Sequence, residues 1–296
     1  MNHTVILIRR HDDHIECNSF EPPTYNLWLH LASVFIVMLV SCLGCGLAAA
    51  SNRLKMPKVL IGMGRHFGTG VILSTAFIHM LMGAVSNLQS ECSPTHAYSS
   101  LAPLIALAAA LGMHVVEYFL TGGAGCKGHH HISAEDSRKM TTYIMEMGIL
   151  SHSVLIGLSL GVAAGHEFVT LLVAIGFHQF FEGLGLGARI AELTFKSSWK
   201  PFWMVFMFSI TTPLGVVLGI ALHSIYDPTS STSLIVQGTL DAIAAGILIY
   251  TGLVELVGRE LSAGSEFSTE KKPTQAIFLA SLYLGVATMA IVGIWV

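Results

Sequence analysis

The residues best suited to chemistry in this sequence lie in the middle of two neighbouring apolar segments. His152 stands in the first segment, and His178 and Glu182 stand in the second. Because His178 and Glu182 are four residues apart, a helix places both on one face. An ionisable side chain inside a membrane-spanning helix is costly, which makes it a candidate functional residue by default. We therefore predict that two imidazoles and one carboxylate converge inside a membrane.

This set of side chains is suited to a divalent metal ion. Imidazole nitrogen together with carboxylate oxygen binds Zn²⁺, Fe²⁺, Mn²⁺ and similar ions. Ser153 and Gln179 follow directly after the two histidines and offer neutral oxygens that could complete the ligand shell. Protons are expected to compete with the metal, because histidine must be neutral to bind it. We expect no resident cofactor, since these ligands suit an ion that binds and leaves again.

The composition places the chain among integral membrane proteins. Of its 296 residues, 53% are hydrophobic and 11% are charged, and the mean hydropathy of +0.66 is far above that of a soluble domain. The net charge of −3 and the absence of a basic patch with interleaved aromatic residues argue against a nucleic-acid partner. The lipid bilayer is the first partner that the sequence predicts.

Eight apolar segments are long enough to cross a bilayer, at roughly 20 residues each. Because every backbone group must be paired within lipid, these segments are predicted to be helices, and the fold class is an all-α integral membrane protein. The metal site is expected between the fourth and fifth helices. The expected spans are Leu27–Ala50, Phe67–Leu88, Leu101–Leu120, Tyr143–Ala164, Phe168–Ala191, Phe202–Leu222, Leu234–Val257 and Gln275–Trp295.

The lysines and arginines are concentrated in alternate connections. Thirteen of the fifteen fall in the connections between spans one and two, three and four, five and six, or seven and eight, or within one turn of them, whereas only Arg9 and Arg10 precede the first span. By the positive-inside rule, both termini are then extracytoplasmic. Residues 1–26 are expected to form an extracytoplasmic tail, and residues 27–296 the transmembrane domain with a cytoplasmic loop at 121–142. We expect the plasma membrane as its location.

Small residues four positions apart recur on several spans. They are Ser153, Gly157, Gly161 and Gly165 in span four, Gly183 and Gly187 in span five, and Gly215 and Gly219 in span six. Such faces let helix backbones approach closely in lipid. We expect packing seams, and close packing of spans four and five would bring His152 towards His178.

The five cysteines do not suggest a disulfide scaffold. Cys42 and Cys45 form a C-x-x-C inside span one, which we interpret as small residues of a helix interior rather than a redox or zinc motif. Cys17 and Cys92 fall on the same predicted outer side, and whether they pair stays open. Cys126 is expected to be a free cytoplasmic thiol.

The loop after span three contains His129, His130 and His131 near Cys126. These side chains could bind a divalent ion weakly, or they could simply belong to a polar linker. Three adjacent histidines in a glycine-rich loop cannot form a rigid site with four ligands, so at most we expect a transient or sensing site.

Other ionisable residues lie in or near the spans. His79 lies in span two, and its part in metal binding is left open, whereas His114 in span three is expected to be a packing residue. His66 and His223 lie near helix ends and are expected to be interfacial. Three further carboxylates at or within helix ends are Asp241, Glu146 and Glu255, of which the last two are expected in the cytoplasmic half.

Several motifs resemble the ZIP family of zinc- and iron-regulated transporter-like proteins, in particular its plant, fungal and protist branch. They are HSVLIGLSLG at 152–161, FHQFFEGLGLGARI at 177–190, FGTGVILSTAFIHML in span two, SITTPLGVVLG in span six and AAGILIYTGLVEL in span seven. The resemblance covers nearly the whole chain after the N-terminal tail.

This resemblance implies uptake of divalent metal, zinc first and ferrous iron next, towards the cytoplasm. It also implies an elevator-like motion, frequent homodimers and metal ligands at His152, His178 and Glu182. Some members bind a second ion through acidic residues or Asn, where this chain has Ser153, Ile156, Gln179 and Ser209. Many relatives place an Asp where this chain has Gly83, four residues after His79, which weakens the prediction of an entry site there.

Two other functional classes remain open from the residues alone. An intramembrane zinc protease would need an H-E-x-x-H motif, but His166-Glu167 is followed by Thr170 at the position of the second histidine. A membrane haem protein could use His152 and His178 as axial ligands. A carboxylate one turn from His178 suits a hydrated divalent ion better than a porphyrin, so we expect a carrier rather than an enzyme.

Overall fold

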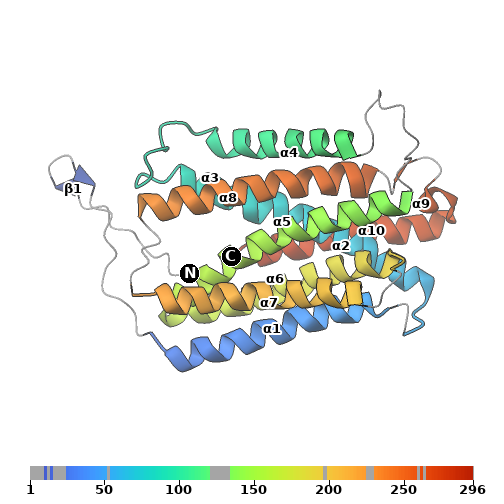
Figure 1. Cartoon of the computed structure of the whole chain (residues 1–296), viewed down its shortest axis with the longest axis horizontal. Helices are drawn as coiled ribbons and strands as arrows, with labels where there is room; N and C mark the ends of the chain where they lie inside the picture. Colours follow the sequence, from blue (N-terminus) through green and yellow to red (C-terminus); the bar gives the residue numbers. More distant parts are fainter. Residues whose placement is uncertain are drawn as a thin grey trace.

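The computed structural model of the chain is a bundle of long helices (Figure 1). It describes residues 10–11, 14–15, 25–51, 54–120, 134–195, 199–224, 230–258, 261–262 and 265–295. The helices are α1 (Leu27–Ala49), α2 (Lys58–Ser74), η1 (Thr75–Leu81), α3 (Met82–Leu88), α4 (Leu101–Leu120), α5 (Ala134–Val162), α6 (Gly165–Glu192), α7 (Trp199–Leu222), α8 (Ser231–Tyr250), η2 (Thr251–Gly258), α9 (Glu266–Thr269) and α10 (Lys272–Val292).

Eight helical stretches in the described part of the chain are long and apolar enough to cross a membrane, which confirms the predicted number of spans. Two of them are composite, because α2, η1 and α3 run on as one stretch and η2 continues α8. The remaining regular structure among the described residues is the short helix α9 and a pair of two-residue strands, β1 (Arg10–His11) and β2 (His14–Ile15).

Some spans begin earlier than the sequence predicted. The second begins at Lys58 rather than Phe67. The fourth span begins at Thr142, one residue before the predicted Tyr143, although its helix α5 already starts at Ala134. Arg65, which the sequence analysis assigned to a connection, therefore lies inside α2, and Arg189 lies inside α6. A helix can extend past the apolar stretch where its polar residues find partners, and hydropathy alone does not show those partners.

The helices pack as two groups, here called the α1 group (α1, α5, α6 and α7) and the α8 group (α2 with η1 and α3, α4, α8 with η2, and α10). Within the α1 group, α1 packs on α6 and α7, and α5 packs on α7. Within the α8 group, α4 lies along α8 and α2 lies along α10. In Figure 1, α4 beside α8 forms one edge of the bundle and α1 beside α6 and α7 forms the other.

Glycine seams explain the closest contacts between helices. A Cβ atom on Gly161 of α5 would lie 2.7 Å from the Cα of Gly219 on α7, and Gly157 faces Gly215 in the same way. The seam of α6 instead faces α1, where a Cβ on Gly187 would lie 2.3 Å from the carbonyl oxygen of Cys45. The prediction of packing seams is confirmed. The seams do not join spans four and five, because that of α5 meets α7 and that of α6 meets α1.

Contacts between the two groups are also close. α2 packs on α6 and α5 packs on α8. A Cβ on Gly68 of α2 would lie 2.3 Å from the Cα of Gly185 on α6, so only glycine fits at this crossing. The site described below lies where these two groups meet.

Candidate functional site

Four buried polar side chains of the predicted site come from α5 and α6. His152 and Ser153 lie on α5, and His178 and Gln179 lie on α6; Ser153, His178 and Gln179 have no exposed surface. Glu182, one turn further along α6, is 1% exposed. Both helices are membrane-spanning and apolar around these residues. The packing of the helices therefore removes the polar side chains from bulk water.

The structure brings the predicted histidines and carboxylate together. The Nε2 of His178 lies 3.2 Å from Oε1 of Glu182, as their spacing of four residues on one helix predicts. The rings of His152 and His178 lie with their centroids 5.6 Å apart, although α5 and α6 make few contacts with each other. The two helices are held near each other through α1 and α7, because α6 packs on α1, α5 packs on α7, and α1 packs on α7.

His79 joins this cluster from a third direction. It lies in η1, and its ring centroid is 5.2 Å from that of His178. Its Nε2 lies 3.0 Å from the backbone oxygen of Met289 on α10. The element that carries it is a π-helix, a distortion that is frequent at functional sites. Sequence reasoning left the role of His79 open because it could not show that η1 faces α6.

Many polar atoms of the cluster have no hydrogen-bond partner. Both ring nitrogens of His178 make no well-aligned hydrogen bond, although Nε2 is close to Glu182. The other buried atoms without a partner are Nε2 of His152, Oγ of Ser153, Oε1 of Gln179, Oε2 of Glu182 and Oγ1 of Thr75 on η1. Buried polar atoms are normally paired, so this concentration of lone pairs is the type of environment that a cation would satisfy.

The neutral-oxygen candidates differ in their availability. The side-chain nitrogen of Gln179 donates to Ser41 at 3.3 Å and to Thr212, and this leaves its oxygen for another partner. Ser209 instead donates to the backbone oxygen of Val205 within its own helix, at 2.7 Å. Gln179 is therefore held in place by its amide nitrogen, whereas Ser209 is satisfied without a ligand.

The candidate ligands lie near one another but do not yet form one site. In the described part of the chain, no three His, Cys, Asp or Glu side chains are already close enough to hold one ion together. The ring separations of 5.2 and 5.6 Å mean that side chains must turn or helices must shift before all of them reach one metal at about 2 Å.

Sequence reasoning underestimated Asp241. It was named only as a carboxylate at or within a helix end, but it lies in the interior of α8, and its Oδ1 is 3.1 Å from Nδ1 of His152. The usable signal was a lone acidic residue inside the apolar stretch of α8. Its partner could not be predicted, because His152 is 89 residues away in sequence.

A cavity of about 430 Å³ adjoins the cluster. Polar groups from the α8 group and from α5 line it, together with Gly83, at which an added Cβ would meet open space. The polar side chains in its lining are His79, Ser86, Asn87, His152, Ser159, Gln237 and Asp241. Because the cavity borders two of the clustered histidines, a hydrated ion inside it could reach them directly.

The remaining candidates lie apart from this cluster. His114 on α4 is exposed, and its Nδ1 lies 2.9 Å from the hydroxyl of Tyr250, which also donates to Glu117. His114 is thus a hydrogen-bonded packing residue, as expected. Glu146 on α5 and Glu255 in η2 are both buried.

The described residues include some of the cysteines singled out in the sequence but none of the loop histidines. His129, His130, His131 and Cys126 lie outside the described residues. Cys92 is disulfide-bonded. Cys17, whose pairing with Cys92 the sequence left open, lies outside the described residues. Cys42 and Cys45 are free thiols in α1, so the interpretation of the C-x-x-C as helix-interior residues fits.

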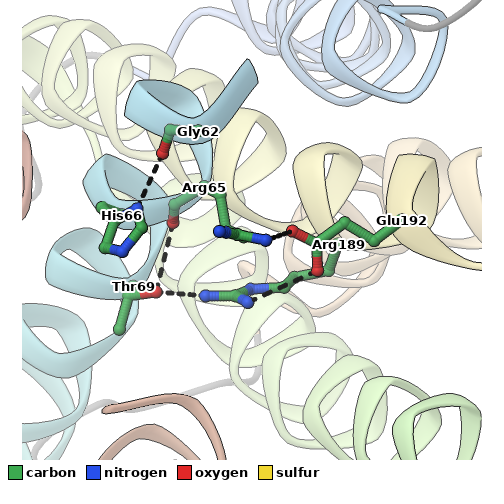
Figure 2. Close-up of polar contacts among 6 residues, drawn as sticks. All are labelled: Gly62, Arg65, His66, Thr69, Arg189 and Glu192. Atoms are coloured by element: carbon green, nitrogen blue, oxygen red, sulfur yellow. Dashed lines mark hydrogen bonds and ion pairs between the residues drawn. The ribbon is translucent and has the colours of Figure 1, made fainter. Parts of the chain in front are cut away.

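A second polar network joins α2 to α6 near the C-terminal end of α6 (Figure 2). Arg65 of α2 pairs with Glu192 of α6 at 2.9 Å, and Glu192 also lies 3.7 Å from Arg189. Arg189 in turn donates to the hydroxyl of Thr69 on α2. Two cations thus share one carboxylate across the boundary between the helix groups.

His66 lies near this network, and the prediction that it is interfacial is wrong. It is fully buried rather than interfacial, its Nδ1 lies 2.8 Å from the backbone oxygen of Gly62, and its ring stacks on Phe278 of α10. The reason is that α2 begins two turns before His66. His223 does lie exposed just after the end of α7, as predicted.

Comparison with known proteins identifies the family. A family model described as "ZIP Zinc transporter" matches residues 123–293. The chain is 31% identical to Zinc-regulated transporter 1 of Candida albicans over 92% of its own length, but it spans only 62% of that relative. It is 31% identical to Zinc transporter 9 of Oryza sativa, with 90% of this chain and 89% of the relative covered.

Zinc transporter 3 of Arabidopsis thaliana is 36% identical to the chain, with 77% of this chain and 72% of the relative covered. The family match covers more than half of the chain, and it includes the two helices that carry His152, His178 and Glu182. The chain therefore belongs to the ZIP family of zinc transporters.

Proposed function

We propose that this protein transports divalent metal cations, Zn²⁺ first and Fe²⁺ next, across a membrane towards the cytoplasm. The observation that carries the proposal is the buried cluster of His152, His178 and Glu182, whose ring nitrogens and carboxylate oxygen include several atoms without a hydrogen-bond partner. The relatives are named as zinc transporters, which supports zinc as the first candidate ion.

The chemistry of the cluster suits transport better than tight storage. Two imidazoles and one carboxylate bind zinc, and neutral oxygens from Ser153 and Gln179, or water, would fill the remaining positions. Such a site holds the ion less tightly than a set of thiolates and can release it. Glu182 supplies negative charge where a dication would otherwise lie among apolar helices.

The separated ligands support a site that forms only when the ion arrives. The ion would enter from the cavity beside His79 and His152, and the three rings would then close on it. Because the proposed ligands come from both helix groups, a shift of one group relative to the other would change how easily the ion can enter or leave the site. His79 is proposed as a contributor on the entry side.

The orientation and assembly are proposed on other grounds. The alternation of basic residues supports extracytoplasmic termini and a cytoplasmic loop with His129, His130 and His131. A plasma-membrane location is consistent with uptake. A homodimer is proposed from the family resemblance alone.

The test is initial-rate uptake of tracer zinc by cells that express the protein, normalised to the amount at the cell surface. Uptake above that of empty-vector cells, with competition by unlabelled Zn²⁺ and Fe²⁺ but not by Mg²⁺, is the expected result. Uptake indistinguishable from that of empty-vector cells, with the protein present at the surface, would contradict the proposed function. Ion competition also ranks zinc against iron.

A further inference from the structure

A carboxylate of α8 is hydrogen-bonded to one of the proposed metal ligands from the opposite helix group. Oδ1 of Asp241 lies 3.1 Å from Nδ1 of His152, and the two side chains are 13% and 5% exposed. We infer that Asp241 is a positioning residue for His152, which orients the imidazole so that its other nitrogen faces the metal. This inference rests on the proposed function and adds a residue to its site.

The chemistry follows from the two nitrogens of imidazole. A neutral ring carries one N–H, and an ionised carboxylate can only accept a hydrogen bond. The contact with Asp241 therefore favours the proton on Nδ1 and leaves the lone pair on Nε2. That Nε2 is buried and has no hydrogen-bond partner. A ring that donates one N–H to a carboxylate and offers the other nitrogen to a metal is the usual arrangement of metal-binding histidines.

The position of Asp241 argues against an incidental contact. It lies in the interior of an apolar, membrane-spanning stretch, where an ionised side chain is costly and normally has a function. It also lines the cavity beside the cluster, together with His152. The carboxylate therefore adds negative charge where a cation would approach, while its hydrogen bond fixes the ring that would receive it.

The contact also crosses the boundary between the two helix groups. α5, which carries His152, packs on α7, whereas α8, which carries Asp241, packs on α4. The alternative is that the hydrogen bond only stabilises the packing of α5 on α8. The two hypotheses can be distinguished by measurement. Loss of a stabilising contact lowers the amount of folded protein, whereas loss of a positioning residue lowers the metal affinity of the protein that does fold.

The experiment measures zinc affinity of the full chain, purified in lipid nanodiscs, by competition with a chromogenic zinc chelator. Asp241→Ala is expected to weaken zinc binding about 10- to 100-fold, as loss of a carboxylate behind a metal-binding histidine does. Asp241→Asn keeps an oxygen that accepts from Nδ1, so it is expected to retain most of the affinity that Asp241→Ala loses.

Ser159→Ala is the matched control. Ser159 lines the same cavity from α5, but its hydroxyl donates to the backbone oxygen of Leu155 in its own helix. Zinc affinity of this variant is expected to stay within about twofold of wild type. Asp241→Val replaces Asp241→Ala if the latter does not elute as a single folded species. In transport assays, the Asp241 variants are expected to raise the apparent KM more than they lower the maximal rate.

The outcomes separate this inference from the proposed function. Wild-type protein that binds no zinc would overturn both. Wild-type protein that binds zinc, with Asp241→Ala and Asp241→Val equally tight, would overturn only the role of Asp241. An Asp241→Asn variant as weak as Asp241→Ala would show that a neutral amide oxygen cannot replace the carboxylate, and would overturn the expectation that acceptance of the hydrogen bond alone positions the ring.

Discussion

His178 and Glu182 form a buried pair on one face of α6, with Nε2 and Oε1 3.2 Å apart and almost no exposed surface on either side chain. The pair needs no tertiary contact to form, because residues four apart on a helix are neighbours. Tertiary packing makes the pair part of a larger cluster, because the rings of His152 and His79 approach His178 from two other helices.

Replacing the charged ligand should be the most damaging change at the site. Glu182→Gln keeps size and polarity but removes the charge that offsets the cost of a dication between apolar helices. We expect zinc uptake below about a tenth of the wild-type rate, and a severe but smaller loss for His152→Ala and His178→Ala. The measurement is tracer uptake normalised to surface protein. Wild-type uptake of both zinc and iron by Glu182→Gln would exclude the proposed site.

The neutral oxygens should matter less than the histidines. Ser153→Ala and Gln179→Ala are expected to change apparent affinity or the preference between zinc and iron, by up to about tenfold, because water can replace a neutral oxygen. Gln179 should be the more sensitive of the two, since its amide also holds Thr212 and Ser41. Dose–response uptake with each metal provides the measurement, and complete loss of transport in Ser153→Ala would contradict this ranking.

The orientation can be tested by access of antibodies to epitope tags. Tags at both termini should be labelled on unpermeabilised cells that carry the protein at the plasma membrane, because basic residues cluster in the alternate connections. A tag inserted beside His130 should be labelled only after permeabilisation. Labelling of that loop in intact cells would reverse the predicted orientation.

The loop histidines should be dispensable for transport itself. Simultaneous replacement of His129, His130 and His131 by Ala is expected to leave the maximal rate within about twofold of wild type, because adjacent histidines in a glycine-rich loop make an incomplete site. Metal-dependent turnover of the protein is the property that we expect to change. Loss of uptake at normal surface expression would place the loop in the transport path.

The network between α2 and α6 should stabilise the contact between the helix groups. Glu192→Ala leaves the guanidinium groups of Arg65 and Arg189 without their shared carboxylate, and we expect a loss of about 1–3 kcal/mol of stability. Thermal unfolding of detergent-purified protein, followed by size-exclusion chromatography, measures this loss. Glu270→Ala, at an exposed position, serves as the control.

Charge reversal sharpens the same test. Glu192→Arg places three cations together and should be worse than Glu192→Ala, whereas adding Arg65→Glu to it should restore much of the stability. The double variant keeps opposite charges facing each other across α2 and α6. If it were no more stable than Glu192→Arg alone, the pairing seen in Figure 2 would not be what holds these helices together.

Much of this protein could be predicted from the sequence because the relevant relationships lie within single helices. Long apolar runs are sufficient to define eight spans, since lipid requires each backbone to satisfy its own hydrogen bonds. A spacing of four placed His178 beside Glu182, and repeated glycines marked faces of close approach. None of these conclusions depends on knowing which helices are neighbours.

The tertiary structure decided which helices meet. The glycines of α5 face α7 and those of α6 face α1, so the approach of His152 to His178 arises through the packing of α1 on α7 rather than from a direct seam. Asp241 meets His152 and η1 brings His79 to the cluster only in the packed bundle. Periodicity fixes the face on which a side chain lies, but its partner depends on packing among all eight spans, and a single sequence does not display that packing.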